Sequence, residues 1–161
     1  MATSLGQLIE QLVDPRGLDA SVKEVFGTVL GWECQLDPEL KLREEETVTA
    51  VVGLGGALSG ACILRSSEAA ARKMVAQMTG MEFAEIDETV QDGIGELCNM
   101  LAGAWKGRLP ELAARCGLSC PTVITGRAYN LHVHAPEFEL RHAYRAADVN
   151  FTVTIVCDGL R

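Results

Sequence analysis

The chain has no excess of basic residues and no long run of uncharged apolar residues. Lys and Arg number 14 against 22 Asp and Glu, which gives a formal net charge of -8 and a pI near 4.9. Nonspecific binding to nucleic acid or to anionic membranes requires clustered Lys and Arg, so the composition favours a protein or a small molecule as partner. No apolar run reaches the roughly 18 residues of a membrane-spanning helix, and the N-terminus lacks the pattern of a signal peptide. We therefore expect a cytoplasmic protein.

Cysteine is present, but without the spacing of a disulfide framework or a metal site. The six cysteines are Cys34, Cys62, Cys98, Cys116, Cys120 and Cys157. Only Cys116 and Cys120 are close together, and no second pair accompanies them. His132 and His134 share a face of an expected strand, yet no third ligand is evident. We interpret the cysteines as buried free thiols and predict no metal site.

At 161 residues, 48% of them hydrophobic, the chain is long enough for one domain with a full core. Apolar residues at helical spacing predict helices over residues 4–13, 19–30, 66–78 and 87–108. Apolar and β-branched runs predict strands over residues 33–42, 47–53, 58–64, 122–126, 129–134, 138–144 and 149–157. Asp19 is the expected N-cap of the second helix, and Leu54-Gly55-Gly56 is the expected hairpin turn.

The predicted helices and strands do not alternate along the chain. Two helices, a hairpin, two more helices and a final series of strands make an α+β pattern. We expect a largely antiparallel sheet packed against long helices in a single domain, because no repeat, low-complexity tract or linker indicates a second one. Residues 150–157 are the candidate edge strand, which would need a partner or a cover.

The most informative pattern lies in the helix predicted over residues 87–108. At about 100° of rotation per residue, Glu96 lies about 40° and Asn99 about 20° from Asp92, so the three share one side. Gly103 falls on the same side, which leaves the surface beside Asn99 shallow. The apolar residues cluster on the opposite side: Val90, Ile94, Leu97, Leu101 and Trp105. The polar side therefore points away from the core and is suited to docking a partner.

The run from Asp92 to Gly103, together with the later run from Gly117 to Gly126, resembles the CheC/CheX/FliY family of response-regulator phosphatases. The family signature is Asp or Ser, three residues, Glu, two residues and Asn, and Asp92, Glu96 and Asn99 meet it in full. The early helix around residues 24–27 carries no second copy of the signature, which is typical of CheX-type members. The likeness covers residues 18–157, so we divide the chain into an N-terminal helical extension, 1–17, and a CheX-like phosphatase domain, 18–161.

The resemblance implies a hydrolase that removes the aspartyl phosphate of a CheY-like receiver domain in chemotaxis or other two-component signalling. The receiver would supply Mg²⁺ and a lysine, so this chain would bind no cofactor of its own. Asn99 would hold the attacking water, and Glu96 would pair with the receiver's lysine. Asp92 and Gly103 would contact the partner beside them. CheX relatives pair through their sheets, so the resemblance also implies a homodimer.

Three other interpretations remain open at this point. Asp92, Glu96 and Asn99 are also compatible with ordinary surface positions of a helix. Ala104-Trp105 after the signature and the added N-terminal helix are compatible with a non-catalytic module that binds a receiver or serves as a scaffold. A sensor that uses Cys116 and Cys120 is a third option.

Overall fold

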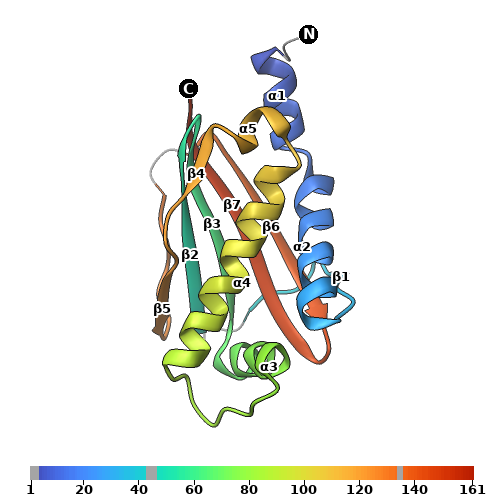
Figure 1. Ribbon diagram of the computed structural model, residues 1–161, viewed down its shortest axis with the longest axis vertical. Coiled ribbons are helices and arrows are strands. Elements are labelled where there is room, and N and C mark those ends of the chain that lie inside the picture. The colour runs from blue at the N-terminus through green and yellow to red at the C-terminus, as the bar shows by residue number, and fades with distance from the viewer. Residues whose placement is uncertain (1–3, 43–46, 134–135) are drawn as a thin grey trace.

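The computed structural model describes residues 4–42, 47–133 and 136–161. A seven-stranded antiparallel sheet forms one layer, in the order β1-β6-β7-β3-β2-β4 with β5 also paired to β2, and helices cover one of its faces (Figure 1). The strands are β1 (Gln35–Leu36), β2 (Thr47–Gly56), β3 (Leu58–Ser67), β4 (Cys116–Leu118), β5 (Thr122–Gly126), β6 (Phe138–Ala146) and β7 (Val149–Leu160). The predicted α+β class with a largely antiparallel sheet is confirmed.

Five helices are found in the part of the chain that the structure describes, and capping side chains set several of their ends. They are α1 (Leu5–Leu12), α2 (Pro15–Leu30), α3 (Glu68–Thr79), α4 (Glu88–Gly107) and α5 (Pro110–Ala113). At the start of α3 the Ser67 hydroxyl accepts a hydrogen bond from the backbone N–H of Ala70. Gly80 ends α3 at φ 72°, a left-handed conformation that glycine adopts at little cost. These ends agree with the predicted helix. None of the helices is both long and apolar enough to cross a membrane.

The second helix starts earlier than predicted. Its first residue is Pro15, and the carboxylate of Asp14 accepts a hydrogen bond from the backbone N–H of Arg16. Proline suits the first helical position, where its missing N–H needs no partner, so Asp14-Pro15 begins α2 rather than ending α1. The predicted cap, Asp19, instead lies inside the helix and accepts a hydrogen bond of 3.0 Å from the Tyr144 hydroxyl.

The boundary predicted between residues 17 and 18 falls within the first turn of α2. Leu12 on α1 and Leu18 on α2 are both fully buried. Figure 1 shows α1 at one end of the molecule, near α5. The division into an extension and a domain stays a prediction.

Two of the predicted strands differ from the structure. The strand over 33–42 is reduced to β1, and residues 129–133 form no strand. The Tyr129 hydroxyl is hydrogen-bonded to the side chain of Thr49, and the Arg65 guanidinium lies 5.0 Å from the centre of the Tyr129 ring. These side-chain contacts hold the segment on the sheet without strand pairing. His132 is exposed, and His134 lies outside the described residues.

The predicted hairpin is confirmed, and its strands are longer than predicted. The last pair between β2 and β3 joins Leu54 to Gly60, so Gly55 and Gly56 lie in the connection between the paired strands, as predicted. They also pair with Gly117 and Cys116 of β4. Gly56 has φ 102°, and a Cβ there would lie 2.3 Å from the carbonyl oxygen of Arg115. This glycine therefore permits both the turn and the close approach of the backbone before β4.

The last strand is not an edge strand, so the prediction for residues 150–157 is wrong. β7 pairs with β3 on one side and with β6 on the other. Its Phe151, Val153 and Ile155 side chains are fully buried against the helices, which is typical of a central strand. The edges among the described residues are β1 with the part of β6 that it leaves unpaired on one side, and β4 with β5 on the other.

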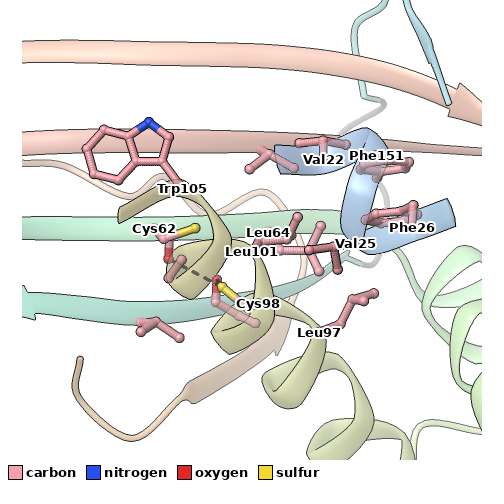
Figure 2. Packing of buried hydrophobic residues seen from close by; sticks show 14 of the residues in the cluster. Val22, Val25, Phe26, Cys62, Leu64, Leu97, Cys98, Leu101, Trp105 and Phe151 are labelled. Carbon is pink, nitrogen blue, oxygen red and sulfur yellow. Dashed lines mark hydrogen bonds between the residues drawn. The ribbon is translucent and has the colours of Figure 1, made fainter. Parts of the chain in front are cut away.

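The core lies between the sheet and helices α2, α3 and α4. Figure 2 shows Leu101 of α4 beside Leu64 of β3 and Val25 of α2, with Trp105 further along α4, away from Phe26. Five of the six cysteines are buried as well, and all six are free thiols, as predicted. The exception to the predicted burial is Cys120, which is exposed.

Candidate functional site

Helix α4 carries the predicted site and crosses the sheet diagonally (Figure 1). Its 20 residues start where the carboxylate of Asp87 accepts a hydrogen bond of 2.9 Å from the backbone N–H of Val90. The side chains of the apolar stripe are buried, as predicted: Val90, Ile94, Leu97, Leu101 and Trp105. Because Trp105 is 3% exposed, it belongs to the core and not to the polar side. The helix is therefore fixed by one face and free to present the other.

The opposite face presents a row of polar side chains, which we call the polar row: Asp92, Glu96 and Asn99. Asp92 and Glu96 are exposed, and Asn99 is partly exposed. None of the three side chains has a hydrogen bond or ion pair with another described residue. The carboxylates are thus available to a cation from outside, and the Asn99 amide keeps both its donors and its acceptor.

Two glycines bring other elements close on either side of the polar row. A Cβ on Gly93 would lie 2.7 Å and 2.8 Å from the two methyl carbons of Val75, on α3. A Cβ on Gly95 would lie 3.1 Å from Cβ of Pro121 and 3.6 Å from a methyl carbon of Val123, on β5. On the helix these glycines fall about 100° and about 60° from Asp92, in opposite directions. The polar row therefore lies between the contact with α3 and the contact with the start of β5.

Gly103 differs from these two glycines. A Cβ at this position would meet no heavy atom within 4 Å. The surface past Asn99 is open, in agreement with the shallow surface expected from the sequence. It leaves room for a partner's backbone next to the amide.

The sequence did not indicate that Pro121 packs against α4 beside the polar row. The Pro-Thr-Val-Ile-Thr-Gly run was noticed, but nothing local indicated that its proline would contact the helix of the polar row. The available signal was the Gly-Ile-Gly spacing at 93–95, since glycine inside a helix is unfavourable unless close packing requires it.

The chain matches the family model described as chemotaxis phosphatase CheX over residues 48–140. The CheY-P phosphatase CheX of Thermotoga maritima is 35% identical over 114 residues, which cover 68% of this chain and 74% of that protein. The chain belongs to the CheX family. The resemblance drawn from the polar row is thus confirmed, and with it the enzyme class, a phosphatase of chemotaxis.

Solved structures agree with the CheX fold. The chemotaxis protein CheX of Vibrio vulnificus is 23% identical with a TM-score of 0.75, covering 91% of this chain and 95% of that one. CheX from the CheX–CheY–BeF3–Mg²⁺ complex of Borrelia burgdorferi is 20% identical with a TM-score of 0.75, covering 89% and 97%. At these identities the likeness shows the fold alone.

The burial of Cys116 argues against a sensor built on the Cys116 and Cys120 pair. Cys116 is buried, and burial raises the pKa of its thiol, so the reactive thiolate is scarce at neutral pH. Cys120 is on the surface. Within the described ranges no group of three or more His, Cys, Asp or Glu side chains is arranged to hold a metal ion.

Proposed function

We propose that this chain accelerates hydrolysis of the aspartyl phosphate on a CheY-like receiver domain, with the polar row of α4 as its half of the active site. The observation that supports this most is the unpartnered state of all three side chains on a helix whose other face is locked in the core. Side chains that served only to stabilise the helix would be expected to pair with neighbours. The T. maritima relative is named as a phosphatase of CheY-P, and the B. burgdorferi relative is found in a complex with CheY.

Asn99 is the residue we assign to the attacking water. Phosphoryl transfer depends on in-line attack and on charge stabilisation more than on removal of a proton. A carboxamide accepts one hydrogen bond from the water and donates another to an oxygen near the phosphorus, which fixes the water's direction of attack. Asn99 stands on the open side of α4 with its amide unengaged by the described residues, so it can do this when a partner docks.

Glu96 is the residue we assign to anchoring the partner. Its exposed carboxylate would pair with the lysine of the receiver's active site, and that contact would set how deeply Asn99 enters the cleft. Asp92, one turn earlier, would contact the rim of the receiver. Gly103, with free space around it, would let the receiver's backbone approach.

Magnesium enters the proposal through the partner. We assign Mg²⁺ to the phosphorylated receiver, because the two carboxylates of the polar row would be engaged with the receiver's lysine and rim. The chain would contribute the amide and the docking charge, while the receiver would contribute the metal and the phosphate.

We also propose a homodimer formed through the sheet. Strand pairing between copies requires a free edge. Among the described residues, β1 pairs with only Tyr144 and Arg145 of β6, so the rest of β6 is open on that side, and β4 with β5 forms the opposite edge. Sedimentation equilibrium checks this, and a monomer at all concentrations would contradict it.

The test of the proposed function is Asn99→Ala with a phosphorylated receiver and Mg²⁺. Phosphate release should be faster with the unaltered chain than with the receiver alone, and the substitution should lower that acceleration by about 100-fold. The thermal unfolding midpoint should not fall, since the amide makes no hydrogen bond to the described residues. Equal acceleration by Asn99→Ala would refute the role of the amide. Binding of the receiver without any acceleration would favour the non-catalytic module.

A further inference from the structure

We infer that Gly95 and Pro121 form a positioning pair for the proposed site, in which the absence of a side chain at 95 sets how far Glu96 and Asn99 stand above the start of β5. This inference rests on the proposed function. Neither residue has a group that takes part in phosphate chemistry, so both would act through the amide and the carboxylate beside them.

Gly95 is buried, although it lies on the side of α4 that carries Asn99. A residue on that side is covered only if another element reaches over it, and here that element is the start of β5. Cβ of Pro121 would lie 3.1 Å from a Cβ at position 95, and Cγ of Pro121 and Cγ2 of Val123 would each lie 3.6 Å away. The first distance is shorter than most contacts of real side chains. Helix and strand therefore meet so closely that a side chain at position 95 would require a shift of a few tenths of an ångström.

Both members of this contact are fixed to the sheet. Val123 pairs with Ala50 in the ladder between β5 and β2. The loop before Pro121 is tied to β2 by Ser119, whose hydroxyl accepts from the backbone N–H of Gly53 at 2.8 Å and whose N–H donates to the Gly53 carbonyl at 2.9 Å. On the helix side, the Cys98 thiol is 3.5 Å from the carbonyl oxygen of Ala50. The start of β5 is thus held in place by the sheet, and α4 packs against it in one position.

An added methyl group at position 95 would change how α4 packs against Pro121. The helix would have to move away from Pro121 by a few tenths of an ångström or turn about its axis. Glu96 follows directly in sequence and Asn99 lies one turn further on the same side, so both would move with it. In-line attack is sensitive to displacements of this order, because about 1 Å of misplacement can cost about 100-fold in rate. The turnover number should therefore fall more than the affinity.

The experiment compares Gly95→Ala with double variants that remove or keep Cβ of residue 121. Gly95→Ala should lower kcat for receiver dephosphorylation by about 5-fold to 10-fold and leave KM within about 2-fold. Adding Pro121→Gly should restore kcat, because the nearest carbon is gone. Adding Pro121→Ala should not restore it, because Cβ stays. Pro121→Gly alone controls for the change of backbone, and Gly107→Ala controls for alanine in α4, since nothing lies within 4 Å of a Cβ there.

A second measurement does not depend on activity. The NMR signals of the Asn99 side-chain carboxamide should shift in Gly95→Ala, return in the double variant with Pro121→Gly, and stay shifted with Pro121→Ala. Unshifted signals, wild-type kcat in Gly95→Ala, or equal rescue by both proline substitutions would overturn the inference. An unaltered chain that fails to accelerate dephosphorylation would overturn the proposed function instead, and the NMR comparison would still decide whether the pair positions the polar row.

Discussion

The two faces of α4 differ in whether their side chains have partners within the molecule. On the inner face even the thiol of Cys98 is engaged, at 3.4 Å from the carbonyl oxygen of Cys62 and 3.5 Å from that of Ala50. On the outer face Asp92, Glu96 and Asn99 contact no polar group among the described residues. One helix thus separates the groups that hold the fold from the groups that remain for a partner. Substitutions on the inner face should change the free energy of unfolding, whereas substitutions on the outer face should change the kinetics of receiver dephosphorylation.

The largest effect is expected from the inner face, with Leu101→Ala. Leu101 is fully buried, and removing such a side chain costs about 3 kcal/mol in the free energy of unfolding through lost burial and the cavity left behind. Denaturant unfolding measures this. At a temperature where the variant is still folded, kcat should match that of the unaltered chain.

The matched control is Leu5→Ala, since Leu5 on α1 is 63% exposed. Its unfolding free energy should change by less than about 0.5 kcal/mol. A fall in kcat for folded Leu101→Ala would contradict the separation of the two faces. It would show that packing on the inner face changes the position of the polar row.

The second effect is expected from the outer face, with Glu96→Gln. Loss of the docking charge should raise KM for the phosphorylated receiver about 10-fold and leave the unfolding free energy unchanged, because the Glu96 carboxylate has no partner among the described residues. Steady-state dephosphorylation measured over a range of salt concentrations checks it, and the variant should show a weaker salt dependence of KM.

Glu10→Gln provides the control for loss of one negative charge, since Glu10 is exposed on α1. It should leave KM within about 2-fold, because long-range attraction between exposed charges is screened. If both variants raised KM equally, net charge and not the polar row would account for docking.

Both faces of α4 could be predicted from the sequence because they depend only on the helical repeat. A repeat of 3.6 residues places the apolar stripe and the polar row without any knowledge of neighbouring elements. The start of α2 at Asp14-Pro15 is also encoded locally, because an N-cap aspartate followed by proline is typical of a helix start. The contact between Gly95 and Pro121 was not readable, since it joins residues far apart in sequence and depends on how β5 pairs with β2.

The difference between local patterns and long-range contacts also explains why two features of the sheet were predicted wrongly. The central place of β7 follows from its pairing with β3, a long-range choice that a strand pattern alone does not encode. Residues 129–133 alternate like a strand, yet Tyr129 is held by Thr49 and Arg65 on other strands. Local patterns predicted the type of most elements, whereas the neighbours of each element came from tertiary contacts.

The smallest effects are expected near the start of α4, where Asp87 is the N-cap with a hydrogen-bond partner and Asp92, in the second turn, has none among the described residues. Asp87 accepts a hydrogen bond from the backbone N–H of Val90, so Asp87→Ala should cost about 1 kcal/mol in unfolding free energy. Asp92 has no such bond, and Asp92→Ala should cost no more than a few tenths of a kcal/mol through the helix dipole.

Denaturant unfolding and receiver KM, measured on both variants, separate the two roles. Asp87→Ala should leave KM unchanged below its unfolding transition, while Asp92→Ala should raise KM about 2-fold to 5-fold as a lost rim contact. If Asp92→Ala destabilised the fold as much as Asp87→Ala and left KM unchanged, Asp92 would serve the helix alone. The outer face would then carry two functional side chains, Glu96 and Asn99, and the partner would contact α4 only from its third turn onward.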